Sequence, residues 1–355
     1  MSTDTVYNNF NEAFLLNGNH YTIDSIKVLA ESLILSDSVN ETHLGEFILN
    51  WIDDSKDIVL KTSGTTSKPK HIIAPKSAFI SSAKATGDFF NLLPENSAFC
   101  CLPFSYIAAK MMFVRAWVLG LKLDIIEPSS SPLNDITQQY DFSAMVPLQV
   151  HNSFSKLNQI KTLLVGGAPV SSTLQNQLKG HPSSIFETYG MTETVSHIAA
   201  KNLSKGERVF TILPDISIAV DDNDCLVVKA PKLTSEVLYT NDVVTLVSND
   251  SFKWLGRFDN VMNSGGIKIY PEQIEKVLQD QISNRFYITS IPDKLLGQKV
   301  ILIIEGKSQD LELDFSEIDI NKRPKNIYFI KEFCETTSGK IQRQKTLETL
   351  NLNHT

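Results

Sequence analysis

The chain has 355 residues, of which 42% are hydrophobic, and it carries a formal net charge of −7 at pH 7. This length allows roughly two or three domains, and the composition suffices for a sizeable core. The net negative charge argues against a general nucleic-acid binder, because such a protein needs positive charge along its surface to neutralise phosphates.

Neither a targeting segment nor a membrane-spanning segment is expected. The N-terminus lacks the basic segment and the apolar core of a signal peptide. The most apolar stretch, residues 98–121, is interrupted by Lys110 and Arg115, which favours protein core over a membrane span. The four cysteines show no metal-ligand spacing and indicate reduced thiols. We therefore expect a cytoplasmic protein without stable membrane insertion.

Short apolar strands alternate with helices through the first half of the chain. Strands are expected at residues 57–60, 71–74, 99–102, 122–126, 143–146, 162–165 and 184–186. Helices are expected at 77–93, with Ser77 as its N-cap, and at 107–119. This alternation predicts an α/β fold whose large N-terminal lobe contains parallel-rich sheets flanked by helices. Residues 209–254 combine short strands with polar turns, which predicts an added antiparallel β segment.

A domain boundary is expected at residues 256–260. Pro271 stands where the first turn of a helix would begin, and Ile274, Val277 and Leu278 form its apolar stripe. Strands are expected at 285–291, 299–305 and 327–330. The sequence thus predicts a large domain over residues 1–258 and a small α+β domain over residues 259–355.

A hydroxyl-rich loop lies between the first two predicted strands. It contains Thr62, Ser63, Gly64, Thr65, Thr66 and Lys70. Small hydroxyl donors, free backbone N–H groups and a nearby ammonium suit a polyphosphate. The loop is not a Walker loop, because the second glycine and the following Lys-Ser/Thr are missing. By itself the loop fits a solvated turn as well as a phosphate site.

A second polar stretch, residues 187–194, follows the predicted strand at 184–186. It is therefore expected at the carboxyl end of a sheet strand, where open α/β sheets bind ligands. Tyr189 beside Gly190 can lay its ring against a flat base, while Thr192 and Glu193 can hold Mg²⁺ through oxygen atoms. The alternative is an ordinary strand-to-helix turn. Upstream, the glycines of residues 166–168 would let a ligand approach the backbone.

These stretches together resemble the adenylate-forming enzymes, which include acyl-CoA synthetases, luciferases and peptide-synthetase adenylation domains. The matching stretches occur in the family's order, namely residues 62–70, 166–168, 187–194, 238–242, 256–259, 263–269 and 336–343. The resemblance covers the chain from Asp57 onward. Family members carry a much longer segment before the hydroxyl loop, so we expect an enzyme with a shortened N-terminal region.

The resemblance implies a role for each matching residue. In the family, the hydroxyl loop holds the β- and γ-phosphates of ATP, and a lysine corresponding to Lys340 acts in catalysis with the Thr192–Glu193 pair. Residues implied at the adenine, ribose and phosphate positions are Gly167, Ala168, Tyr189, Gly190, Asp242 and Arg257. This chain has Asn241 where the family usually has glycine, which makes the ribose role of Asp242 less direct.

The resemblance also implies a mobile C-terminal lobe and a second half-reaction. Asp259 would be the hinge, and Gly265, Gly266 and Lys268 would line the path of coenzyme A, with a solvated Lys268 as the alternative. The implied enzyme is an acid–CoA ligase that uses ATP, Mg²⁺ and coenzyme A on a small-molecule carboxylic acid. A homo-oligomer is left open.

Residues 190–199 resemble the corresponding stretch of the o-succinylbenzoate–CoA ligases of menaquinone synthesis. That acid keeps a second carboxylate after activation, and a buried unpaired anion is expensive. We expect the donors to be Ser105, Lys110, Ser196 and His197, unless Lys110 and Arg115 lie on the outer face of their helix. The alternatives are another small aryl- or acyl-CoA synthetase, or a non-catalytic nucleotide-binding relative.

Overall fold

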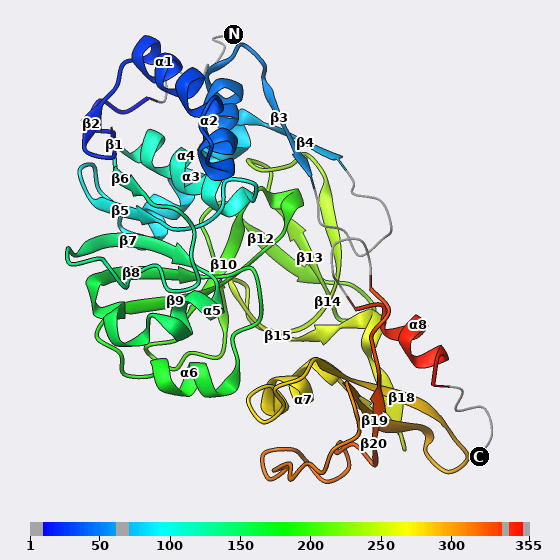
Figure 1. Cartoon of the computed structure of the whole chain (residues 1–355). Helices are drawn as coiled ribbons and strands as arrows, with labels where there is room; N and C mark the ends of the chain where they lie inside the picture. The colour runs from blue at the N-terminus through cyan, green and yellow to red at the C-terminus, as the bar shows by residue number, and fades with distance from the viewer. Residues whose placement is uncertain (1–9, 62–70, 336–340, 351–355) are drawn as a thin grey trace.

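The computed structural model describes residues 10–61, 71–335 and 341–350, which form a large and a small lobe (Figure 1). A sheet of 13 strands runs through the large lobe, and a sheet of 5 strands forms the small lobe. Within these ranges, no helix is both long and apolar enough to cross a membrane. The arrangement confirms the predicted α/β class.

One half of the large sheet is parallel. Its strands follow the spatial order β6–β5–β7–β8–β9, with bounds Ser97–Cys100 (β5), Lys122–Ile125 (β6), Tyr140–Met145 (β7), Ile160–Val165 (β8) and Ser184–Gly190 (β9). Two short strands, β1 (Leu15–Leu16) and β2 (Asn19–His20), extend it beyond β6. The five parallel strands are short apolar runs between turns, which is why the sequence predicted a strand at each of them, whereas β1 and β2 were not predicted.

Helices cover the parallel half on both faces (Figure 1). One group comprises α1 (Ile23–Ile34), α2 (Val39–Ile52), α3 (Lys76–Phe90) and α4 (Ile107–Leu119); the other comprises α5 (Pro147–Asn152) and α6 (Ser172–Leu178). Helix α4 has the predicted bounds, and most of its side chains are buried. The predicted cap of α3 is wrong: Pro75 precedes the helix and Ser77 lies inside it.

The other half of the large sheet is antiparallel, as the short strands and polar turns of residues 209–254 predicted. It contains β10 (His197–Asn202), β11 (Phe210–Ile212), β12 (Ser217–Val220), β13 (Cys225–Lys229), β14 (Val237–Ser248) and β15 (Ser251–Arg257). It continues the parallel half directly, because β10 pairs with β9. Strands β3 (Asp57–Lys61) and β4 (His71–Pro75) form a separate sheet of two strands and pair with no other strand in the described part of the chain.

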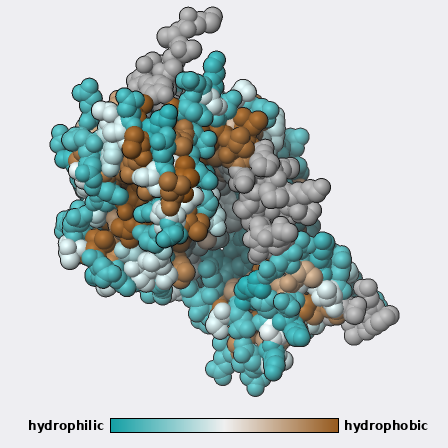
Figure 2. Space-filling view, turned by 45° about the horizontal axis from the view of Figure 1, so that its top comes forward, coloured by the Kyte–Doolittle hydropathy of each residue, from teal (hydrophilic) through white to brown (hydrophobic). Residues whose placement is uncertain are grey.

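The small lobe has its own core. Its elements are β16 (Met262–Ser264), β17 (Ile267–Ile269), α7 (Pro271–Leu278), β18 (Phe286–Asp293), β19 (Gly297–Glu305), β20 (Asn326–Ile330) and α8 (Arg343–Glu348). A 3₁₀ turn, η4 (Phe258–Asn260), joins it to β15. In the space-filling view the small lobe projects from one end of the large lobe, with hydrophilic side chains over much of its surface (Figure 2).

Candidate nucleotide and acid site

The Tyr-Gly pair lies at the end of a strand rather than in the turn after it. Strand β9 continues through Gly190 and pairs with β10, so the predicted strand end at residue 186 is wrong. A Cβ on Gly190 would lie 2.4 Å from the carbonyl oxygen of Ser196 and 2.5 Å from Cα of His197. Only glycine therefore allows β9 and β10 to approach this closely.

Between β9 and β10 the chain makes a tight, strained turn. Residues Thr192–Thr194 form a 3₁₀ turn, and Val195 follows with φ 64° and ψ −44°. The N–H of Ser196 donates to the carbonyl of Thr194 at 2.6 Å, which closes a γ-turn around Val195. A β-branched residue rarely adopts positive φ, so this backbone is strained. The turn leaves Glu193 exposed and carries Ser196 and His197 back toward the interior.

Ser196 and His197 meet a buried arginine of α4. Arg115 is 2% exposed, and its Nη2 donates to Ser196 Oγ at 2.7 Å and lies 3.3 Å from His197 Nδ1. Arg115 Nε donates to Thr86 Oγ1 at 3.3 Å, and His197 Nε2 lies 3.4 Å from that same hydroxyl. The four side chains thus come from α3, α4 and the start of β10, and we call them the Arg115 cluster.

The Arg115 cluster contains a buried positive charge without a carboxylate partner among the described residues. Burial lowers the pKa of Arg115, which reflects the cost of keeping its guanidinium away from water. Burial, and then the charge of Arg115, hold the pKa of His197 well below its ordinary value. The imidazole is therefore neutral at neutral pH, and the cluster carries one net positive charge.

The four side chains predicted to bind the second carboxylate of the acid lie in different surroundings. Ser196 and His197 belong to the Arg115 cluster, as described above. Ser105 is exposed just before α4, and the ammonium of Lys110 lies 5.7 Å from the centre of the Phe47 ring. The expectation that Arg115 could lie on the outer face of its helix is wrong. Its burial was indicated in the sequence by its position as a single arginine within an otherwise apolar helical segment, residues 111–119.

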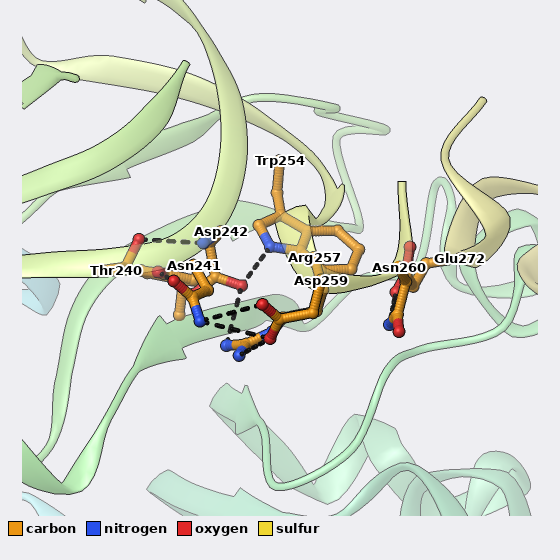
Figure 3. A network of polar contacts seen from close by, with 9 residues as sticks. Thr240, Asn241, Asp242, Trp254, Arg257, Asp259, Asn260 and Glu272 are labelled. Atoms are coloured by element: carbon orange, nitrogen blue, oxygen red, sulfur yellow. Dashed lines mark hydrogen bonds and ion pairs between the residues drawn. The ribbon is translucent and has the colours of Figure 1, made fainter. Parts of the chain in front are cut away.

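A second polar network surrounds Asp242 (Figure 3). The hydroxyl of Tyr189 donates to Asp242 Oδ2 at 2.8 Å, and Trp254 Nε1 donates to Oδ1 at 3.0 Å. Arg257 Nη1 lies 3.8 Å from Oδ1. Burial, followed by the charge of Asp242, raises the pKa of Tyr189. Tyr189 and Arg257, both expected near the nucleotide, therefore meet at Asp242, although the three residues come from three different strands.

Asn241 does not need the left-handed backbone that glycine favours. It lies within β14 and has no positive φ, so the turn considered from the sequence is a strand here. Its side-chain amide instead donates to the carboxylate of Asp259, 3.3 Å from Oδ1 and 3.2 Å from Oδ2 (Figure 3). Arg257 Nη2 donates to the same carboxylate at 3.1 Å.

The remaining predicted residues lie in turns around these networks. Gly167 follows β8 with φ +83°, beside the exposed Ala168. Gly265 and Gly266 form the β16–β17 turn, also with positive φ. Lys268 is half-exposed and pairs with Asp224 of the large lobe at 3.4 Å.

Two predicted parts lie outside the described residues: the hydroxyl loop (Thr62, Ser63, Gly64, Thr65, Thr66 and Lys70) and Lys340. Within the described ranges, no three His, Cys, Asp or Glu side chains gather in a way that could hold a metal ion. Protein Mg²⁺ sites for nucleotides often use only one or two carboxylates together with phosphate oxygens. The exposed carboxylate of Glu193 fits that kind of site.

Comparisons with known proteins agree on one family. The family model described as AMP-binding enzyme matches residues 53–244. A 2-succinylbenzoate–CoA ligase from Listeria monocytogenes is 26% identical over 342 residues, covering 85% of this chain and 72% of the relative.

Solved structures that resemble this chain include AMP-forming acyl-CoA synthetases. An acyl-CoA synthetase (AMP-forming)/AMP-acid ligase II-like protein from Dyadobacter fermentans is 33% identical with a TM-score of 0.60, covering 91% of this chain and 98% of that one. O-succinylbenzoate coenzyme A synthetase from Bacillus subtilis, solved with ATP and a magnesium ion, shares the fold at 18% identity, with a TM-score of 0.70 over 82% of this chain and 70% of that one. The chain therefore belongs to the AMP-binding enzyme family, as its motifs predicted.

Proposed function

We propose that this protein is an ATP-dependent acid–CoA ligase whose substrate is 2-succinylbenzoate, an intermediate of menaquinone synthesis. The names of its relatives support the reaction type and the acid. The observation that carries the choice of acid is the Arg115 cluster, a buried guanidinium that has no described carboxylate partner. An acid with two carboxylates can react through one of them and neutralise Arg115 with the other.

The chemistry of the acid supports this assignment. A buried unpaired charge is costly, and an incoming carboxylate converts Arg115 into a buried ion pair with hydrogen bonds. Ser196 and Thr86 supply hydroxyl groups next to it, and neutral His197 adds no second positive charge. A long-chain fatty acid has no group that would use this cluster.

The reaction proceeds in two halves. In the first, the acid's carboxylate attacks the α-phosphorus of ATP, and pyrophosphate leaves. In the second, the thiol of coenzyme A attacks the carbonyl of the acyl-adenylate, and AMP leaves. Fixed positive charge in a dry site stabilises the negative charge that develops on the phosphate oxygens. We assign that role to Lys340, and we assign the binding of β- and γ-phosphates to the hydroxyl loop.

The other site residues hold the reactants. Asp242, oriented by Tyr189 and Trp254, would accept hydrogen bonds from the ribose, and Arg257 would lie beside the phosphates. When bound, Mg²⁺ supplies positive charge to the phosphates, and Glu193 with Thr192 would hold it. Gly265, Gly266 and Lys268 would serve the coenzyme A half, after the small lobe turns about Asp259. We place the enzyme in the cytoplasm.

The test uses matched acids and matched variants. 3-Benzoylpropionate has the reacting chain of 2-succinylbenzoate but lacks the ring carboxylate. For the wild type we expect pyrophosphate release to be at least on the order of a hundredfold more efficient with the diacid, because an unpaired polar site rejects the analogue. Arg115→Met should remove most of this preference while leaving the KM for ATP unchanged, and Arg115→Lys should retain part of it.

Two results would count against the proposal. Preference of the wild type for a fatty acid would discard 2-succinylbenzoate while keeping the reaction type. ATP binding without pyrophosphate release from any acid would indicate a non-catalytic nucleotide-binding relative. A thermal melt of each Arg115 variant separates loss of acid binding from loss of the fold.

A further inference from the structure

The chain passes between the two lobes at η4, with Asp259 at its centre. The Asp259 carboxylate is held by two side chains that precede it in the large lobe (Figure 3). Arg257 donates to Oδ2 at 3.1 Å, and the Asn241 amide reaches Oδ1 at 3.3 Å and Oδ2 at 3.2 Å. Both carboxylate oxygens of the residue at the crossing therefore depend on large-lobe donors.

Asn241 is well placed to hold this carboxylate in one position. It lies on β14, whose neighbour β15 pairs with it from Asp242 opposite Arg257 to Ser248 opposite Ser251. This ladder fixes the backbone from which the amide projects. Because the backbone at residue 241 has no positive φ, the position does not require glycine, and the effect of asparagine here is the added amide.

We propose that Asn241 is a latch that favours the present orientation of the small lobe by binding Asp259 from the large lobe. The inference rests on the proposed function, in which the small lobe turns about Asp259 between the two half-reactions. Turning changes the backbone angles of Asp259 and carries its carboxylate away from Asn241. A contact made in only one of two states shifts their equilibrium by its own free energy.

Besides the packing of α7 against β15, the two lobes are joined by further polar contacts. In the described residues they include Gln273 to the Leu255 carbonyl at 3.2 Å, Asp280 to the Thr173 N–H at 3.2 Å, and the Lys268–Asp224 pair. All three involve exposed side chains, and exposed polar contacts contribute little each. An exposed amide–carboxylate hydrogen bond corresponds to about a twofold to fivefold change in an equilibrium constant.

The kinetic test measures the two half-reactions separately in Asn241→Ala. Pyrophosphate release without coenzyme A reports the first, and thioester formation from supplied acyl-adenylate reports the second. We expect their ratio to change about twofold to fivefold, with one rate rising as the other falls. Asn241→Asp should change the ratio in the same direction and further, because two carboxylates repel. Asn249→Ala, at the opposite end of the same hairpin, is the matched control and should leave the ratio unchanged.

A second measurement does not depend on activity. Spin labels at Gln177→Cys on α6 and Ser308→Cys after β19, in a Cys334→Ser background, report the distance between the lobes. Asn241→Ala should broaden or shift that distance distribution relative to Asn249→Ala. An unchanged distribution, or an equal fall of both half-reactions, overturns the latch. If the wild type has no ligase activity, the proposed function fails, while the distance measurement still decides whether the latch exists.

Discussion

Val195 shows how one residue can connect the two halves of the site. Its buried side chain packs in the main core, while its backbone adopts the positive φ that L-residues avoid. Thr192 and Glu193 precede this turn, and Ser196 and His197 follow it. The γ-turn is therefore the shortest covalent link between the proposed metal-binding carboxylate and the Arg115 cluster.

This strain predicts an inverted order of stability for two variants. Within a helix or strand, a protein with glycine at a given position is less stable than one with alanine there by about 0.5–1 kcal/mol. At residue 195 we expect Val195→Gly to be more stable than Val195→Ala by about 1 kcal/mol, because only glycine relieves the positive φ. Both lose the buried side chain, so each should be less stable than the wild type. Urea unfolding measures the difference, and a more stable alanine variant would show that the turn is not strained.

At the scale of elements, α2 supports the segment that leads into α4. Asn40 in the first turn of α2 is 8% exposed, and its Oδ1 accepts from the backbone N–H of Phe104 at 2.8 Å. Phe104 precedes Ser105 and the start of α4, the helix that carries Arg115. A helix from the N-terminal part of the chain thus fixes a wall of the proposed acid site.

We expect Asn40→Ala to lower the free energy of unfolding by about 1–3 kcal/mol, because the buried N–H of Phe104 loses its acceptor. Since the segment before α4 then moves, the KM for the acid should rise while the KM for ATP stays constant. Asn40→Asp retains an acceptor oxygen and serves as the conservative control. A parallel rise of both KM values in Asn40→Ala would indicate general damage to the fold instead.

At the scale of the whole molecule, α7 of the small lobe brings a lysine against the large lobe. Lys276 lies about one turn after Gln273 on α7, and Gln273 and Asp280, which follows the helix, both contact the large lobe. Burial, and then repulsion from Lys201, lower its pKa from 10.5 to about 8; Glu187 opposes this, while Arg208 and Lys253 add to it. The packing of α7 against the large lobe is therefore least stable when Lys276 is protonated.

The sign of the pH effect follows from this lowered pKa. Between about pH 8 and 10.5 the unfolded chain binds more protons at this lysine than the folded protein, so its contribution to stability rises with pH in this window. We expect the urea midpoint of the wild type to rise relative to that of Lys276→Met as the pH is raised from 8 to 10. A constant difference across these pH values would show that Lys276 is not buried against positive charge.

The sequence by itself determined the family and the places of the elements that have the clearest local patterns. Strands such as Ile160–Val165 are apolar runs between turns, and helix Ile107–Leu119 ends at a glycine, so local patterns suffice to locate them. The motifs that identify the family are also contiguous in the chain. Ser77 failed as a cap because Pro75, with its fixed φ, already precedes the helix at Lys76.

Only the tertiary structure decided which side chains meet. Arg115 and Ser196 are 81 residues apart in sequence, and no local periodicity links a single arginine of an apolar helix to a turn between two strands. The same holds for Asn241 and Asp259, which are brought together by pairing of β14 with β15. Such contacts depend on strand register and helix packing, which are set by the whole core rather than by neighbouring residues.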